Sequence, residues 1–569
     1  MTIDTLIKGG TVIDGTGSEA YTADIAITKG AITDIGRITQ RATRVIDADG
    51  AIVTPGLVDI HTHYDGQATW ANRMSPSSHF GVTTVIAGNC GVGFAPVYPE
   101  DREKVVELME GVEEIPGAVL NEGINWQWET FPEYMDYLDG KKFDMDIGVQ
   151  IPHAPMRVYV MGQRGLDREP ATPSDIAAMR KLTREAMAAG AIGFSTSRSI
   201  NHKSSNGEHT PSLQAEIDEM SGIAQGIRDA GHGVIELISD FFELDNEFDI
   251  LEAMAEKGSC PLSFTLAESI GGQDGWRHLL SKIEAANEKG LTIRGQVAPR
   301  AIGIQLGLTT TVNPLSGHPS YQAIAHLPLP EQVKRLSDPA VKERILNEAV
   351  DDKYYAAIFN ALREMKNVWQ LDERPDYEPA PEQSIGSRAA AAGRNPIEYA
   401  YDVLLEDEGL AMLYWPIINY GSQNLDVCRE LMLHPHTLMG LGDGGAHVGT
   451  ICDASFPAFS LIHWGRDRQR GEKIDLAQLV HNQTSATAAA VGLSDRGELK
   501  VGKRGDINII DFNNLVLDAP RMVYDLPSKA GRLQQKSTGF LATMVKGSVT
   551  YENDEETDAL PGRLIRKRD

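Results

Sequence analysis

The chain has 569 residues, with 53 Lys and Arg against 80 Asp and Glu, which gives a net charge of −27. A length above about 250–300 residues indicates several domains or one large barrel with insertions, and excludes a single small module. An acidic surface repels phosphate backbones and anionic lipid, so neither nucleic acid nor a membrane is an expected partner.

Both ends of the chain are predicted to form β-strands. Residues 1–54 contain alternating apolar and polar runs broken by Gly, Asp and Pro, and "GELKVGKRGDINIIDF" and "ATMVKGSVTYENDEE" near the C-terminus have the same pattern. We assign residues 1–54 and 481–569 to one small β-sandwich domain built from both termini. Two unrelated β appendages would give the same pattern.

Residues 55–480 alternate strand-like apolar runs with helical stretches, which is typical of a parallel α/β barrel. Eight runs are expected to be strands: 57–63, 82–88, 146–153, 191–197, 233–239, 261–266, 292–297 and 436–443. Eight strands with intervening helices predict a TIM-type barrel, whose strand carboxyl ends carry the chemistry.

Two long segments interrupt this alternation. Residues 300–410 include "LPLPEQVKRLSDPAVKERILNEAV" and are too long for an ordinary loop, so they predict a helical insertion near the barrel mouth. Residues 92–145 form a second insertion with the aromatic segment "WQWETFPEYMDYL", which either packs locally or contacts a substrate.

The first residues of the chain do not have the pattern of a secretory signal, and no apolar run reaches the length of about 18 residues that a transmembrane helix needs. The four cysteines have no close spacing, which argues against a disulfide scaffold. These features predict a cytoplasmic protein.

The most informative motif is "PGLVDIHTHYDG" at residues 55–66. Its two histidines, His61 and His63, are two residues apart, so on an extended strand both imidazoles lie on one face and can bind one metal. Two polar loop histidines are the alternative, but the Pro-Gly turn before the motif and the β-rich segment that precedes it favour the metal site.

Three segments resemble the amidohydrolase superfamily across almost the whole chain: "TPGLVDIHTH", "GDGGAH" and "TSATAAAVGLSDRGELKVGKRGDINIIDF". The strings "FGVTTVIAGNCGVGFAP", "GAIGFSTS" and "PGRLIR" are similar to its N-acyl-D-amino-acid deacylase, or D-aminoacylase-like, branch. The resemblance implies a distorted TIM (β/α)8 barrel, a β-sandwich from both termini, a homo-oligomer, and hydrolysis by metal-activated water.

The resemblance also implies a metal centre. His61 and His63 match the family's barrel-strand ligands, Cys90 matches its thiolate ligand, and Asp443 matches its catalytic aspartate, which also touches the metal. A thiolate with two neutral imidazoles suits one zinc ion per chain, although a His-His-Asp site also accepts manganese, iron or cobalt. A Cys90 that only packs in the core is the alternative.

The chain departs from the branch at two further histidine ligands. Their positions fall on or beside Glu236–Leu237 and Phe264–Thr265, and the branch's substrate-binding lysine falls on Leu266. A divergent member with a single-metal site is therefore expected. Glu236 either replaces a lost ligand, acts as an acid or base, or pairs at the barrel rim.

Other polar residues follow the predicted strands and are candidates for substrate binding. They are His153, Arg157, Arg198, His202, Glu236, Arg294, Gln296 and His447. Arginines that converge on one mouth would bind a carboxylate through paired hydrogen bonds, whereas salt bridges at the rim would give them a structural role.

The combined prediction is a metal-dependent amidohydrolase that cleaves an amide bond of a small, carboxylate-bearing molecule, with Asp443 as the catalytic residue. A metal-dependent lyase on the same barrel, of the decarboxylase or retro-aldol type, is one alternative. A non-catalytic binding protein derived from the fold is the other.

Overall fold

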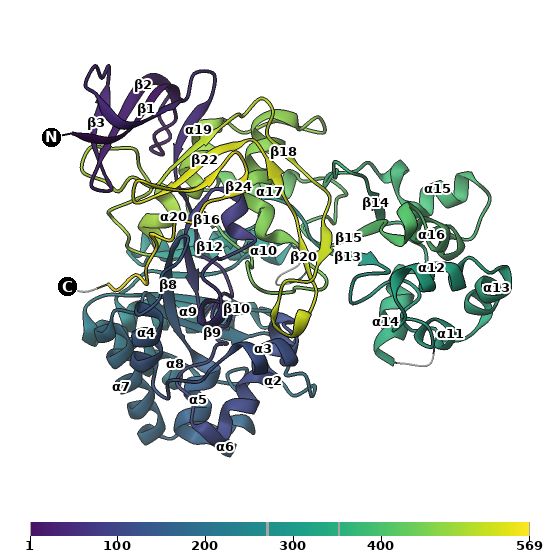
Figure 1. Ribbon diagram of the computed structural model, residues 1–569. Coiled ribbons are helices and arrows are strands. Elements are labelled where there is room, and N and C mark those ends of the chain that lie inside the picture. The colour runs from purple at the N-terminus through teal and green to yellow at the C-terminus, as the bar shows by residue number, and fades with distance from the viewer. Residues whose placement is uncertain (1, 269–271, 273, 351–352, 568–569) are drawn as a thin grey trace.

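The protein consists of a barrel, a β-rich layer against it, and a helical lobe that projects to one side (Figure 1). The computed structural model describes residues 2–268, 272, 274–350 and 353–567. Within these residues, no helix combines the length and the apolar character that crossing a membrane requires.

The barrel is one sheet of eight strands, all parallel, in the order β16-β12-β11-β10-β9-β8-β7-β6. Its strands are β6 (Leu57–Asp59), β7 (Val82–Ala87), β8 (Asp146–Pro152), β9 (Gly193–Arg198), β10 (Val234–Ser239), β11 (Leu262–Thr265), β12 (Ile293–Val297) and β16 (Thr437–Met439). Just beyond the ends of β6 and β16, a parallel bridge between Thr62 and Gly444 brings the two edge strands together. The predicted TIM-type barrel is confirmed, and each strand lies inside or across its expected segment.

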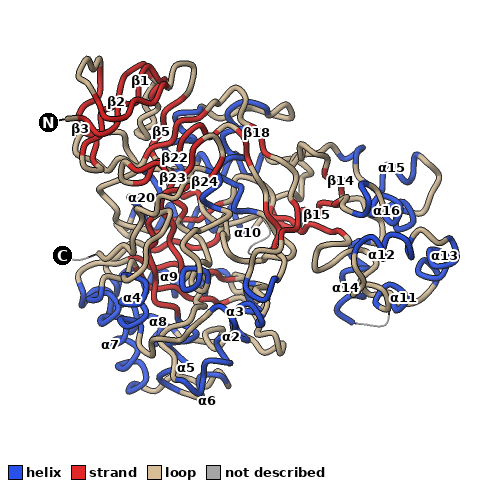
Figure 2. The backbone as a smooth tube through the Cα atoms, viewed as in Figure 1, coloured by secondary structure: helices blue, strands red, loops and turns tan. Residues whose placement is uncertain are grey.

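Helices cover the outside of the barrel (Figure 2). They include α5 (His153–Met161), α7 (Pro173–Ala189), α8 (Ile217–Ala230), α9 (Leu244–Gly258), α10 (Gly275–Glu288), α17 (Asp426–Leu433), α19 (Leu476–Gln483) and α20 (Ser485–Ala490). Helix α7 shows why such segments are helical. Thr172 and Asp175 form a reciprocal capping box at its start, and Gly190 takes a left-handed conformation with φ 104° at its end.

The two termini form one β-rich domain around a nine-stranded sheet, as predicted. Its strands are β1 (Ile3–Val12), β2 (Tyr21–Thr28), β3 (Ala31–Gly36), β4 (Ala42–Asp47), β5 (Ile52–Pro55), β17 (Ile507–Ile510), β22 (Phe540–Val545), β23 (Ser548–Glu552) and β24 (Glu555–Glu556). Strands β5 and β17 pair antiparallel, with Val53 opposite Ile509. This pairing joins the N-terminal strands to the C-terminal ones. The C-terminal tail then returns to the barrel, where Leu564 pairs with Ile147 of β8.

The lobe is inserted between β12 and β16 and is attached through a three-stranded sheet (Figure 2). This sheet contains β13 (Ile302–Gly307), β14 (Trp369–Leu371) and β15 (Met412–Ile418). The helices of the lobe are α11 (Pro319–Gln322), α12 (Leu329–Leu336), α13 (Pro339–Asn347), α14 (Lys353–Leu362), α15 (Ile385–Ala391) and α16 (Pro396–Leu404). Buried Leu306, Leu336, Ile345 and Tyr401 belong to a hydrophobic core of its own, so the lobe packs as a separate unit.

The second insertion also contains helices. These are α2 (Arg102–Glu113), α3 (Gly117–Gly123) and α4 (Phe131–Asp139). Helix α2 ends beside the barrel mouth. There the carbonyl of Glu113 accepts a hydrogen bond, at 2.5 Å, from the backbone N–H of His447 in the loop after β16.

Candidate functional site

His61, His63 and Cys90 come together where β6 and β7 end. Beyond β6, the rings of His61 and His63 lie with their centroids 5.5 Å apart. Potential ligand atoms of the two histidines and of Cys90 all lie within 4.8 Å of one another, and all three residues are buried. Cys90 Sγ is 3.4 Å from His61 Nε2. The structure thus brings three of the predicted ligands into one cluster.

Asp443 completes this cluster from the loop after β16. Its Oδ1 lies 3.3 Å from His61 Nε2 and 3.7 Å from His63 Nε2. Two ligands bound tetrahedrally to one ion at ordinary zinc distances lie about 3.3–3.8 Å apart. The separations of Asp443 from His61 and His63, and of Cys90 from His61, therefore lie in the range for ligands that share one metal ion.

Gln296 on β12 orients His61. Its Oε1 lies 2.7 Å from His61 Nδ1, and its Nε2 donates to Ser263 Oγ at 2.9 Å. Because the amide oxygen can only accept, His61 carries its proton on Nδ1, and the Nε2 lone pair points toward the cluster. Gln296 was predicted to bind substrate, and the structure places its amide oxygen against His61.

Glu236 on β10 also points at the cluster. Its Oε2 accepts a hydrogen bond from the Cys90 backbone N–H at 2.9 Å, and its Oε1 lies 3.8 Å from His61 Nδ1. This buried Oε1 has no hydrogen-bond partner among the described residues. An unpartnered buried carboxylate oxygen is costly, and a nearby cation removes that cost.

Glu113, at the end of α2, is a site residue that sequence reasoning missed. It is 1% exposed, and its Oε1 lies 3.3 Å from His63 Nδ1. The only available signal was helical spacing: Val106, Met109 and Glu113 lie three and four residues apart on the buried face of α2. Nothing in that pattern indicates that the face reaches His63.

His447 and His202, two predicted substrate-binding residues, lie near the cluster. His447 Nδ1 is 3.3 Å from Glu114 Oε2, and its Nε2 is 3.9 Å from Glu113 Oε2. Its side chain is 24% exposed, so it can reach a molecule entering from solvent. His202 hydrogen-bonds to Ser197 Oγ at 2.8 Å. Burial, together with the charge of His447, lowers the pKa of His202 to about 3, so this ring is neutral.

The electrostatics of the cluster favour a bound cation. Burial raises the pKa of Glu236, of Glu113 and of the Cys90 thiol, and the negative charge of Asp443 adds to the effect for each. Burial also disfavours charge on His63, but Glu113 and Asp443 outweigh it and raise the pKa of His63 to about 9. A divalent ion placed among these groups stabilises the carboxylates and deprotonates a coordinating thiol. The donor set therefore fits a metal.

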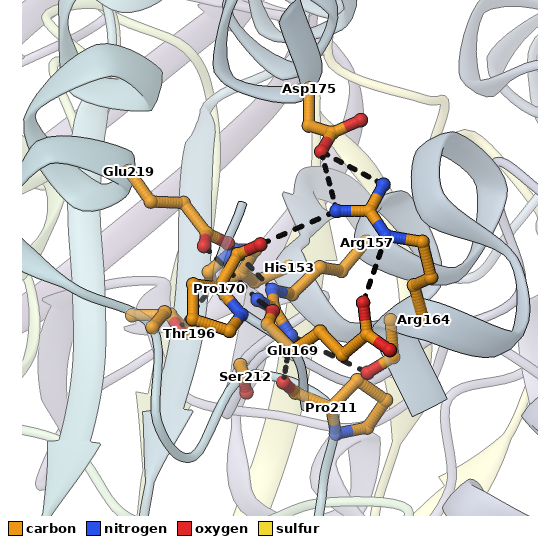
Figure 3. A network of polar contacts seen from close by, with 12 residues as sticks. His153, Arg157, Arg164, Glu169, Pro170, Asp175, Thr196, Pro211, Ser212 and Glu219 are labelled. Atoms are coloured by element: carbon orange, nitrogen blue, oxygen red, sulfur yellow. Dashed lines mark hydrogen bonds and ion pairs between the residues drawn. The ribbon is translucent and has the colours of Figure 1, made fainter. Parts of the chain in front are cut away.

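His153 and Arg157 belong to a different network (Figure 3). Both are fully buried and bind Glu219 of α8, with His153 Nε2 at 2.9 Å and Arg157 Nε at 2.7 Å from Glu219 Oε1. His153 Nδ1 bonds to Thr196 Oγ1 at 2.8 Å. These contacts join α5, β9 and α8, and give both residues a structural role.

Arg198 and Arg294 are also held away from the cluster. Arg198 makes a two-pronged ion pair with Glu247 of α9, at 2.7 and 2.8 Å. Arg294 lines a cleft with Val234, Leu262 and Thr292, at the amino ends of the strands and so opposite the cluster. The predicted convergence of arginines on one mouth is not found among these side chains.

Comparisons with known proteins agree with this architecture. The family described as "Amidohydrolase family" matches residues 44–551. A D-aminoacylase from Alcaligenes xylosoxydans xylosoxydans is 31% identical, over 99% of this chain and 98% of that protein. A D-aminoacylase structure, described with a binuclear metal centre, superposes with a TM-score of 0.65 at 21% identity and covers 99% of both chains. The N-acyl-D-glutamate deacylase of Bordetella bronchiseptica, complexed with zinc and a phosphonate inhibitor, gives 0.63 at 20% identity over the whole of both chains.

Proposed function

Because the chain belongs to the amidohydrolase family, we propose that it hydrolyses the amide bond of a small N-acylated amino acid at the cluster of His61, His63, Cys90 and Asp443. The family resemblance predicted from the sequence is confirmed. The prediction of a hydrolase that acts on carbon–nitrogen bonds other than peptide bonds is confirmed as well. Metal-dependent amide hydrolysis follows from membership of the amidohydrolase family. The names of the relatives, D-aminoacylase and N-acyl-D-glutamate deacylase, support an N-acylated D-amino acid as the substrate.

The proposed cofactor is one zinc ion held by His61, His63, Cys90 and Asp443. A thiolate among imidazole ligands favours zinc over harder ions, and zinc is present in the related deacylase structure. When bound, the ion activates a water molecule and polarises the amide carbonyl. The observation that carries the proposal is the convergence of the three buried donors within 4.8 Å, with Asp443 3.3 Å from His61.

The side chains around the ligands have distinct tasks. Burial opposes ionisation of Asp443, but His63 and His61 outweigh it and lower its pKa, so the carboxylate is ionised at neutral pH. It can accept a proton during attack and pass it to the leaving nitrogen. Gln296 holds His61, and Glu113 faces His63, so both rings are fixed in orientation.

The carboxylate of the substrate needs a donor at the mouth. Arg157, Arg198 and Arg294 are committed elsewhere, so we assign this contact to His447, whose side chain is 24% exposed. His202, which is close enough to feel the charge of His447, is a second candidate for this contact. Assembly as a homo-oligomer and a cytoplasmic location stay predictions of the sequence.

The test combines metal analysis with product analysis. The purified chain is expected to hold about one zinc and to release the acyl group from N-acetyl-D-amino acids, with label from oxygen-18 water in the released carboxylate. Cys90→Ala and Asp443→Asn should lose metal or activity, whereas Cys428→Ala, which changes another fully buried cysteine, should retain both.

Three results would contradict the proposal. Full zinc content and turnover in Cys90→Ala would remove Cys90 from the site. Cleavage of a substrate without incorporation of the label would favour the lyase alternative, and a wild-type protein that neither binds metal nor turns over amides would favour the non-catalytic one.

A further inference from the structure

A second cavity, of about 480 Å³, lies between the root of the helical lobe and helix η6 (Ser460–Asp467). Its walls include Arg374, Tyr377, Phe459 and Arg470. None of the lining residues belongs to the cluster of His61, His63, Cys90 and Asp443. The volume is within the range of about 300–1,000 Å³ that is typical of small-molecule sites.

The acidic groups in the wall are mostly neutralised by the fold. Glu378 accepts hydrogen bonds from Arg468 at 2.9 and 3.0 Å, from His463 Nε2 at 3.0 Å and from the Leu425 backbone N–H at 2.8 Å. These donors outweigh burial and lower the pKa of Glu378 to about 2. Asp467 is paired with both prongs of Arg466, at 2.7 and 2.8 Å. Neither carboxylate can neutralise a further cation.

Two arginines of the wall have no such partner. In the parts of the chain that the structure describes, neither Arg374 nor Arg470 has a carboxylate within 4.0 Å. Arg470 Nη1 donates to the carbonyls of Glu378 and Pro379 at 3.0 and 2.9 Å, which positions its guanidinium and leaves other donors open. Asp376 is the remaining acid of the lining. The three arginines and three acids of the lining balance in formal charge, but its two unpaired guanidiniums outnumber its one remaining carboxylate, so an anion would find free donors here.

We propose that this cavity binds a small organic anion, with a carboxylate or phosphate head and a flat apolar body. Arg374 and Arg470 supply charge-assisted hydrogen bonds to the head, and Tyr377, Phe459 and Ile462 supply apolar wall for the body. Helix η6 is a π-helix, a rare form that occurs often at functional sites. This binding site is independent of the amide hydrolysis proposed above.

Calorimetric titration of the metal-loaded full chain with phenyl phosphate and with benzoate tests the proposal. Wild type should bind at least one of them saturably, and the better ligand identifies the head group. The double variant Arg374→Gln, Arg470→Gln should bind this ligand at least about 10-fold more weakly, because each substitution removes a hydrogen bond between two charged groups. Arg41→Gln, which changes an exposed arginine just before β4, should bind as wild type does.

Two outcomes would overturn the proposal: no saturable binding of either compound by wild type, or an unchanged affinity in the double variant. The second would place the anion elsewhere, for example at the metal cluster. Thermal unfolding and zinc content of the double variant should equal those of wild type, since both arginines are exposed. A weakened affinity then reports the cavity rather than misfolding.

Discussion

Replacing Gln296 tests whether this residue orients a metal ligand or binds substrate. In Gln296→Leu, His61 Nδ1 loses the amide oxygen that lies 2.7 Å away. The ring is then free to move its proton to Nε2, the atom that lies 3.4 Å from Cys90 Sγ and 3.3 Å from Asp443 Oδ1. A protonated Nε2 cannot bind a metal.

The expected size follows from similar outer contacts in metal sites, whose loss weakens metal binding by about 10–100-fold. Zinc affinity is measured by competition with a chromophoric chelator, beside kcat and KM of the zinc-saturated enzyme. Ser263→Ala is the matched control. It removes only the outer hydrogen bond at 2.9 Å and leaves the Gln296 oxygen in place, so its effect should be several-fold smaller.

Gln296→Glu should restore most of the affinity, because a carboxylate oxygen accepts the same hydrogen bond. The reasoning is refuted if Gln296→Leu keeps wild-type zinc affinity and raises only KM. That result would return Gln296 to the substrate-binding role predicted from the sequence.

Three further perturbations are informative. Glu113→Gln should weaken zinc binding about 10-fold, since Glu113 lies 3.3 Å from His63. The neighbouring substitution Glu114→Gln should change zinc binding little. Equal effects of the two substitutions in a chelator competition would contradict this. Glu219→Gln should lower the free energy of unfolding by about 3–5 kcal/mol without altering zinc content, because buried Arg157 loses its counter-charge. Denaturant unfolding measures the change, and a loss below about 1 kcal/mol would count against this explanation. Folding lowers the pKa of Glu378 from 4.5 to about 2, so ionised Glu378 stabilises the folded protein by about 3 kcal/mol. This stabilisation is complete above pH 4.5 and is lost as the pH falls toward 2. The difference in unfolding free energy between wild type and Glu378→Gln should therefore shrink on acidification below pH 4.5, and a difference independent of pH would exclude this source.

Much of the fold was predictable because its determinants are local. Apolar runs bounded by turn residues marked all eight barrel strands, and alternation identified the strands of both termini that share one sheet. The spacing of His61 and His63 on an extended segment predicted their shared face. Cys90 and Asp443 could be recognised only through the family resemblance, because a lone cysteine or aspartate has no local pattern that indicates a ligand.

The tertiary structure decided which polar side chains reach the site. Arg157 and Arg198 lie near the carboxyl ends of barrel strands, as Cys90 does, yet Glu219 and Glu247 on the surrounding helices bind them. No local pattern indicates which partner a long side chain will find. Glu113 reaches His63 from a helix 50 residues further along the chain, because α2 packs against the loop that carries His447. By itself the sequence determined the barrel, the β-rich domain of the termini and the histidine pair, since these depend on periodicity and neighbouring residues. The partners of buried charges depend on contacts between distant segments, and those contacts exist only in the folded chain.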